Sequence, residues 1–362
     1  MNVIRHLSLC TGLLGLALAG FTAPLHAQNP WSAVWEPPVA APLYPPEKGP
    51  VVVVDEAHFN FHTINGRYHD FARVLERDGY VVRPGKMPFS STAMQGTQIL
   101  VIANALSEWN RDQVNWSPPI SSAFSAEEIN AVQEWVLGGG SLLLIADHLP
   151  FAGATEKLAA AFGFEVINGY ALDRREIHKA TLDRPFVFAR HGNSSSDGTL
   201  ADHAITHGRN SSERVDRVMT FMGAAFRARG PAAPLLVFGK EINSYQTETF
   251  GKISAATPSV AASGLMQGAA RHYGKGRVVF FSEAGLFGVQ WQGGKPVGMN
   301  HPGASGNLQL LLNTMHWLNG ALESLRMDQR TTSRANSVPE AIVTGAALAA
   351  IGAAADHQVP AR

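Results

Sequence analysis

Short apolar runs alternate with amphipathic segments through most of the chain. Five runs are predicted to be strands: residues 51–54, 80–83, 98–103, 141–147 and 276–282. Other segments repeat apolar residues at helical spacing, namely 68–77, the stretch after Ser125, 154–162 and 307–318. This alternation predicts the α/β class, with a mostly parallel sheet and helices on both of its faces.

One α/β domain is expected over residues 50–322. Ser125 and Glu128 have the spacing of a capping box, so a helix is predicted to begin there. Residues 165–255 show polar loops and only two apolar runs, and we expect them to add strands and an excursion to the same domain.

Both ends of the chain differ in composition from this domain. Arg5 precedes an apolar stretch at 7–21 that is too short to span a bilayer, so residues 1–27 are predicted to be a signal peptide, with an uncleaved anchor as the alternative. Residues 28–49 form a proline-rich leader, and 323–362 an Ala-rich tail that is disordered or loosely attached. We expect a periplasmic or secreted protein with no stable membrane insertion after cleavage.

Charge and cysteine content exclude several kinds of site. The chain has 29 basic and 29 acidic residues, so its net charge of +0 argues against nucleic acid as a partner. Its single cysteine, Cys10, lies in the predicted signal peptide, which excludes disulfides, zinc–thiolate sites and a catalytic thiol from the mature chain. The Walker A, G-x-G-x-x-G, HExxH and strand-to-helix G-x-S-x-G patterns are absent as well.

The strand at 51–54 runs directly into polar side chains that can bind ligands: Asp55, His58, Asn60 and His62. Ligands of open α/β sheets bind at the carboxyl ends of the strands, so this stretch is predicted to line a site. The alternative is a loop whose polar groups bond its own backbone.

A metal ion is one alternative for this stretch. In an extended chain, His58, Asn60 and His62 point to one side and Phe59 and Phe61 pack inward on the other. The two histidines then lie roughly 13 Å apart, which makes shared ligation of one ion marginal unless the loop bends. No cofactor is certain, and a divalent metal remains open.

Two further strand ends carry carboxylates. Asp147 and His148 follow the strand at 141–147, and Glu283 follows the strand at 276–282. With Asp55 and His58 they are the candidate catalytic residues; the alternative is turn capping. The candidate substrate-binding residues, which suit sugars or amides through stacking and hydrogen bonds, are Asn60, His62, Trp291, Gln292, Asn300 and His301.

Several segments in this order resemble the class I glutamine amidotransferase-like fold, in particular an uncharacterised exported bacterial family: DEAHFN, QILVIANAL, SAEEINAVQEWVLGGGSLLLIADH, LADHAITHGR and GKGRVVFFSEAGLF. The resemblance covers roughly residues 50–320 and implies a flavodoxin-like layered sheet. Amidotransferases of this class use a cysteine at a strand-to-helix elbow, where this chain has Asp147 and His148. The resemblance therefore implies the fold without glutamine hydrolysis.

Three functions stay open at this point. The first is a hydrolase or lyase on a small polar substrate of the sugar or amide type, with Asp55, Asp147 or Glu283 as base and His58 or His148 as acid. The second is a non-catalytic ligand- or carbohydrate-binding domain of the cell envelope. The third is an interaction scaffold in which these residues are structural.

Overall fold

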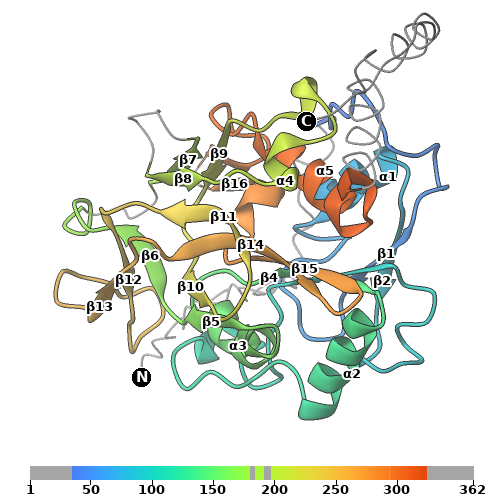
Figure 1. Ribbon diagram of the computed structural model, residues 1–362. Helices are drawn as coiled ribbons and strands as arrows, with labels where there is room; N and C mark the ends of the chain where they lie inside the picture. The colour runs from blue at the N-terminus through green and yellow to red at the C-terminus, as the bar shows by residue number, and fades with distance from the viewer. Residues whose placement is uncertain (1–34, 180–183, 191–196, 293, 324–362) are drawn as a thin grey trace, which may run out of the picture.

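The computed structural model describes residues 35–179, 184–190, 197–292 and 294–323 (Figure 1). The predicted signal peptide and the tail from residue 324 onward lie outside the described residues. Within the described part, no helix is both long enough and apolar enough to cross a membrane.

One half of the large sheet is parallel. Its strands are β1 (Val51–Asp55), β2 (Val81–Gly85), β3 (Ile99–Ala103), β4 (Ser141–Ile145) and β15 (Gly276–Phe281), arranged in the order β2-β1-β3-β4-β15. Every neighbouring pair in this row is parallel. All five lie where the apolar runs predicted strands, which confirms the α/β class. The row brings the carboxyl ends of these strands to a common edge.

The other half of the large sheet is largely antiparallel. It continues from β15 through β14 (Met266–Tyr273), β11 (Ala233–Phe238), β8 (Gly198–Leu200), β7 (Phe186–Ala189) and β9 (Arg217–Thr220). Only β7 and β8 pair in parallel within this part. The predicted excursion between 165 and 255 therefore supplies much of this half.

Shorter strands complete the fold. β10 (Ala225–Ala228) joins β14 to β5 (Phe164–Ile167). A separate three-stranded sheet contains β13 (Ser259–Ala261), β12 (Ile242–Tyr245) and β6 (Tyr170–Asp173). A hairpin is formed by β16 (Val289–Gln292) and β17 (Lys295–Gly298).

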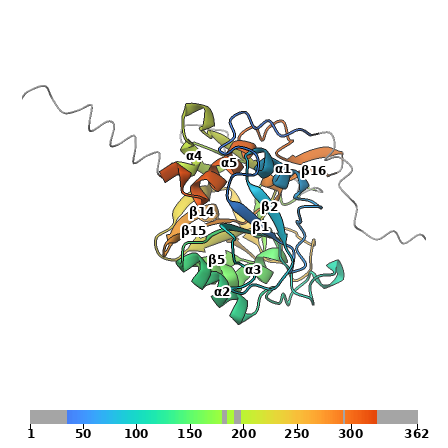
Figure 2. The same ribbon diagram turned by 90° about the vertical axis from the view of Figure 1, so that its right-hand side faces the viewer.

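Helices lie above and below the sheet in Figure 2, with α1 (His69–Arg77), α4 (Ala204–His207) and α5 (Asn307–Leu318) on one side and α2 (Ala126–Leu137) and α3 (Phe151–Ala161) on the other. Short 3₁₀ helices occur at Gln113–Asn115, Ser211–Glu213 and Gly285–Phe287. The predicted capping box at the start of α2 is present, with Ser125 as N-cap and Glu128 as its partner.

The strands contribute buried residues to two hydrophobic cores. Val52 and Val54 of β1 belong to a cluster with α1 and α5 residues, whereas Leu142 and Leu144 of β4 belong to a cluster with α2 and α3 residues. All five residues of β3 and of β4 are buried. Strands buried on both faces explain why these runs are continuously apolar in the sequence.

The described part of the proline-rich leader contacts the domain. Trp35, Val39 and Tyr44 pack against the core on the side of α1. The backbone N–H of Leu43 donates to Oδ1 of Asp78 at 2.7 Å. Residues 35–49 are therefore anchored over α1.

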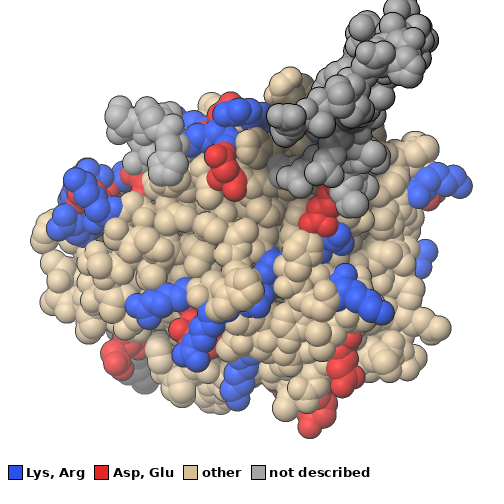
Figure 3. Space-filling view, in the orientation of Figure 1, with Lys and Arg blue, Asp and Glu red and all other residues tan. Residues whose placement is uncertain are grey.

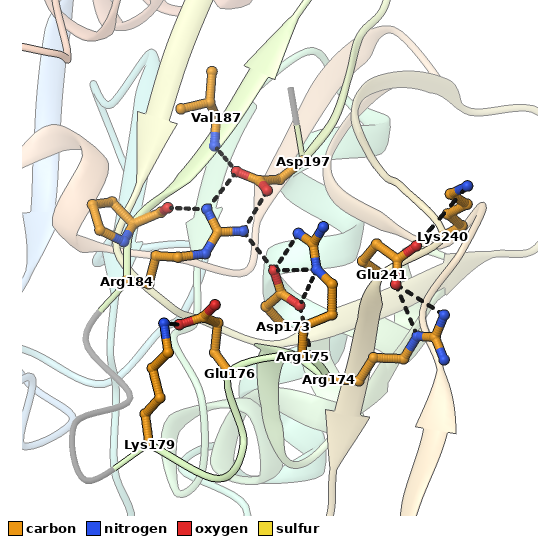
Figure 4. A network of polar contacts seen from close by, with 11 residues as sticks. Asp173, Arg174, Arg175, Glu176, Lys179, Arg184, Val187, Asp197, Lys240 and Glu241 are labelled. Atoms are coloured by element: carbon orange, nitrogen blue, oxygen red, sulfur yellow. Dashed lines mark hydrogen bonds and ion pairs between the residues drawn. The ribbon is translucent and has the colours of Figure 1, made fainter. Parts of the chain in front are cut away.

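An ionic network holds the edge of the excursion (Figure 4). Asp173 accepts hydrogen bonds from Arg175 and Arg184, and Arg184 also pairs with Asp197. Burial opposes the charge of Asp173, but its two arginine partners hold the pKa of that carboxyl well below its usual range. Two arginines balance two aspartates, so we interpret this network as a structural connection between β6 and the approach to β7.

Charges of both signs are interspersed on the face shown in Figure 3, with no broad region of a single sign. This face therefore lacks the extended basic surface that a nucleic acid requires.

Candidate functional site

A cavity of about 410 Å³ opens beyond the carboxyl ends of β3, β4 and β15. The hairpin β16–β17 and residues of the excursion form its other walls. The lining combines aromatic rings with polar and charged side chains: Phe61, His62, Arg67, Asn104, Trp116, Asp147, His148, Phe151, Phe221, Met222, Phe250, Glu283, Gly285, Gln290, Trp291, Gln292 and Val297. This is the position at which open α/β sheets bind ligands.

A second cavity of about 300 Å³ lies beside β2. Its described lining contains Arg83 and Lys86 but no Asp, Glu or His. It lacks groups suited to acid–base chemistry near neutral pH, so the cavity at the strand ends is the better candidate.

The structure separates the predicted site residues into two groups. His62, Asp147, His148, Glu283, Trp291 and Gln292 line the strand-end cavity. The remaining predicted residues are absent from its described lining: Asp55, His58, Asn60, Asn300 and His301. The expectation that Asp55 and His58 share one pocket wall with Asp147 and Glu283 is therefore not met.

Asp147 and Glu283 form a carboxyl pair because β4 and β15 are neighbours. Ile145 lies opposite Phe281 in the parallel register, and each acidic residue follows two positions later. Glu283 is 2% exposed and accepts backbone hydrogen bonds from Gly285 at 2.6 Å and Leu286 at 2.8 Å. Burial, together with the charge of Asp147, raises the pKa of Glu283 well above its usual range. The two carboxyl groups thus have unlike environments.

Asp147 is the more accessible member of the pair. Its Oδ1 accepts the backbone N–H of His148 at 2.8 Å. No described residue donates a hydrogen bond to its Oδ2. One carboxylate oxygen is therefore available to a ligand or a water molecule.

His148 follows Asp147 and has one ring nitrogen occupied. Its Nδ1 lies 2.6 Å from the carbonyl oxygen of Leu149, so Nδ1 carries the proton. The ring stacks on Tyr170 with a centroid separation of 4.4 Å. In the neutral ring, Nε2 then carries a lone pair beside the cavity.

Asn104 connects two of these side chains and was not among the predicted site residues. It directly follows β3, is fully buried and has a positive φ of 48°. Its Oδ1 accepts the backbone N–H of Asp147 at 2.8 Å, and its Nδ2 lies 3.2 Å from Nδ1 of His62. The strand-end rule that selected Asp55 and Asp147 applies equally to Asn104.

His62 is a neutral ring in this setting. It is 3% exposed, and burial, aided by the positive charge of Arg67, lowers its pKa to about 3. Its Nε2 has no hydrogen-bond partner among the described residues.

This burial predicts a pH-dependent stability. Because the folded-state pKa of His62 lies below the unfolded value, the unfolded chain binds more protons, and stability is lost as the pH falls from about 6.5 toward 3. Between pH 6.5 and 4.5 the natural protein should lose about 2–3 kcal/mol more than His62→Gln, as measured by urea unfolding. Equal losses in both proteins would contradict this assignment.

Asp55 and His58 belong to a different cluster. Nδ1 of His58 lies 2.9 Å from both carboxylate oxygens of Asp55, and its Nε2 lies 2.8 Å from Oε1 of Glu128. Asn60 also donates to Asp55, at 3.0 Å. Both ring nitrogens of His58 are therefore engaged by carboxylates within the protein.

The charge state of this cluster follows from its partners. Burial alone would lower the pKa of His58, but the hydrogen bonds and charges of Asp55 and Glu128 outweigh it, so the pKa is raised. The ring also contacts Phe89 and Phe124, with centroids 4.6 and 4.8 Å away. This arrangement connects the end of β1 to the start of α2.

The prediction that residues 58–62 form an extended chain is wrong. Phe59 has a positive φ of 45°, which breaks the alternation of an extended chain. His58 and Asn60 consequently face Asp55, whereas His62 faces Asn104. Phe59 and Phe61 are 44% and 37% exposed, so the expectation that both rings pack inward is wrong.

Asn300 and His301, which were also predicted to bind the substrate, instead hydrogen-bond backbone groups of the protein. Nδ2 of Asn300 donates to the carbonyl of Gln290 at 3.2 Å, and Nδ1 of His301 accepts the backbone N–H of Gly303 at 2.9 Å. Trp291, by contrast, lines the cavity and is 48% exposed.

The described side chains offer no ready-made metal centre. Among the described residues, no group of three or more His, Cys, Asp or Glu side chains is arranged to hold a metal ion. The Asp55–His58–Glu128 cluster instead satisfies its charges through hydrogen bonds within the protein.

Comparison with known proteins yields structural neighbours only. No family model and no curated protein matches this chain. The N-terminal domain of mmIFT52 is similar, with 14% identity, a TM-score of 0.49 and coverage of 74% of this chain and 97% of that one. A ThuA-like protein from Bacteroides uniformis matches with 9% identity, a TM-score of 0.42 and coverage of 75% and 92%.

One comparison concerns part of a larger enzyme. A β-galactosidase from Bacillus circulans sp. alkalophilus is 10% identical with a TM-score of 0.39, and the match covers 75% of this chain but 31% of the enzyme. Likenesses at this level assign neither a family nor a function, so function has to be argued from the cavity itself.

Proposed function

We propose that this protein is a hydrolase that acts on a small sugar-type substrate bound in the strand-end cavity. The observation that carries the proposal is the Asp147–Glu283 pair, whose two carboxyl groups lie in unlike environments at the ends of adjacent strands. Pairs of carboxyl groups in unlike environments are a recurrent acid–base arrangement in glycoside hydrolysis.

The two groups have complementary roles in this proposal. Glu283, whose pKa is raised, is the protonated acid and donates its proton to the leaving oxygen as the glycosidic C–O bond breaks. Asp147, with one oxygen available, is the base and accepts a proton from the attacking water. The water oxygen forms the new bond to the anomeric carbon, so protons and electrons balance.

The cavity lining supports a sugar as the ligand. Aromatic faces such as that of Trp291 stack on the apolar face of a sugar ring, while Gln290 and Gln292 offer donors and acceptors to its hydroxyl groups. A cavity of about 410 Å³ has the size of a small-molecule site.

The predicted signal peptide adds a location to the proposal. An exported hydrolase would meet its substrate in the periplasm or outside the cell. The resemblance to an exported amidotransferase-like family is consistent with this location and stays a prediction.

A screen of small glycosides and glycosyl amides tests the proposal, with product release measured with and without added Zn²⁺, Mn²⁺ or Ca²⁺. Trp291→Ala should raise KM by about 3- to 10-fold because it removes a stacking ring from the cavity. Trp109→Ala is the matched control, since Trp109 is 62% exposed and absent from the described lining. Equal effects of the two substitutions on KM would contradict the proposal that the substrate binds in the strand-end cavity.

A non-catalytic binding domain is the second candidate. The observation behind it is that both oxygens of Glu283 accept backbone hydrogen bonds and that the side chain is nearly inaccessible, as in a structural carboxyl group. Saturable sugar binding without turnover of any substrate in the screen would establish this function in place of hydrolysis.

A further inference from the structure

The strand-end cavity contains a cation that has no anionic partner among the described residues. Arg67 lines the cavity, donates from Nη1 to Oε1 of Gln290 at 2.8 Å and lies 4.2 Å above the ring of Phe61. No carboxylate of the described residues pairs with it. A guanidinium has five N–H donors in a planar fork, so the one bond to Gln290 leaves Arg67 with donors for a ligand in this cavity.

A neutral donor lines the same cavity. Asn104 has a fixed amide orientation, because its Oδ1 accepts the backbone N–H of Asp147. Its Nδ2 must therefore donate to Nδ1 of His62, which in turn places the proton of the neutral ring on Nε2. That Nε2–H is buried and has no acceptor among the described residues.

A buried donor without a partner is costly, and most such groups find an acceptor. His62 lines the cavity, and its buried Nε2–H is the ring donor that is left for a ligand entering against this side chain. Arg67 is close enough for its charge to act on His62. One ligand group with several acceptor oxygens and a negative charge would match both side chains.

We infer that the ligand is an acidic sugar, a hydroxylated ring bearing a carboxylate, and that Arg67 and His62 bind this carboxylate. The inference rests on the proposed function, which it deepens by naming the substrate class. A carboxylate supplies acceptors only, as the guanidinium and the Nε2–H require. The hydroxyl groups of the ring are left for Asp147 and the glutamines at the cavity wall.

Calorimetric titration with D-galacturonate and D-galactose tests the inference on the natural protein. Galacturonate should bind at least about tenfold more tightly than galactose, because a charge-assisted hydrogen bond contributes more than a neutral one. Arg67→Gln should weaken galacturonate binding by about 10- to 100-fold and change galactose binding by less than about threefold. Arg111→Gln is the matched control: Arg111 also lies over a phenylalanine, Phe59, at 5.7 Å, but is absent from the described lining.

Asn104→Asp tests the role of His62 separately. The new carboxylate keeps an acceptor for the N–H of Asp147 but offers His62 only another acceptor, so the ring proton moves to Nδ1. Nitrogen NMR should report Nε2–H in the natural protein and Nδ1–H in the variant, without any ligand. Galacturonate binding should fall about tenfold in the variant, with galactose binding nearly unchanged.

The outcomes are distinguishable. Equal binding of both sugars overturns the acidic-sugar inference and leaves a sugar hydrolase standing. Binding of neither sugar overturns the acidic-sugar inference and removes the support for a sugar-type ligand in the cavity. An Nδ1–H ring in the natural protein overturns the part of the inference that concerns His62.

Discussion

Asp147→Asn is expected to lower kcat on any glycoside that the protein hydrolyses by about 10²- to 10⁴-fold, the range that a general base contributes. The substitution preserves shape, and Oδ1 of the new amide can still accept the N–H of His148. Sugar affinity should fall much less than kcat, because the amide of asparagine can still hydrogen-bond a sugar hydroxyl but cannot accept the proton of the water.

A control variant and a second measurement test the role of Asp147 further. Asp112→Asn changes a carboxylate whose side chain is 67% exposed and that is absent from the described cavity lining, and it should leave kcat unchanged. Removing the charge of Asp147 should also lower the pKa of Glu283, because that charge helps to raise it. A rate in Asp147→Asn equal to that of the natural protein would exclude Asp147 as the base.

Glu283→Gln is a less informative variant. Both oxygens of Glu283 accept backbone N–H groups, from Gly285 and Leu286. A glutamine would place its NH₂ group against one of these donors and leave that N–H unsatisfied in a buried position. Loss of activity in this variant would therefore mix catalysis with local destabilisation.

His58→Phe is expected to destabilise the folded protein by about 3–5 kcal/mol, the cost of removing one partner from a buried ionic cluster. The substitution leaves Asp55, which is fully buried, and Glu128 without the imidazole that joins them. Phenylalanine retains ring contacts with Phe89 and Phe124, so the loss should come from charge and hydrogen bonding rather than from a cavity.

His69→Phe is the matched control for urea unfolding. The side chain of His69 is 41% exposed and its ring nitrogen lies 3.8 Å from Asp70, so its replacement should cost less than about 1 kcal/mol. A His58→Phe protein that is as stable as the natural protein but has lost turnover would contradict the structural role that we propose for the Asp55–His58–Glu128 cluster. It would instead support a catalytic role for His58.

The sequence predicted the strand-end chemistry because the carboxyl edge of a parallel sheet gathers the residues that follow each strand. Asp147 and Glu283 each follow an apolar run, and the structure brings them to one cavity. The sequence does not reveal that these two strands are neighbours, because their paired residues lie 136 positions apart in the chain. The α/β class followed from composition and periodicity, and the five predicted strands match the observed ones to within two residues at each end.

The alternation of residues along the sequence gave a wrong prediction where the backbone departs from an extended chain. The positive φ of Phe59 turns His58 and His62 toward different partners, and no glycine marks that turn in the sequence. Arg67 and Phe250 carried no local signal either, because tertiary contacts bring both to the cavity. Glu128 was recognised only as a capping residue, yet it also binds His58 from 70 positions away.

A crystal structure of the protein soaked with D-galacturonate tests the central claim most directly. We predict sugar density in the strand-end cavity, within hydrogen-bonding distance of Asp147 and against the ring of Trp291. Density confined to the cavity beside β2, or an empty strand-end cavity in crystals of a protein that binds the sugar in solution, would contradict it.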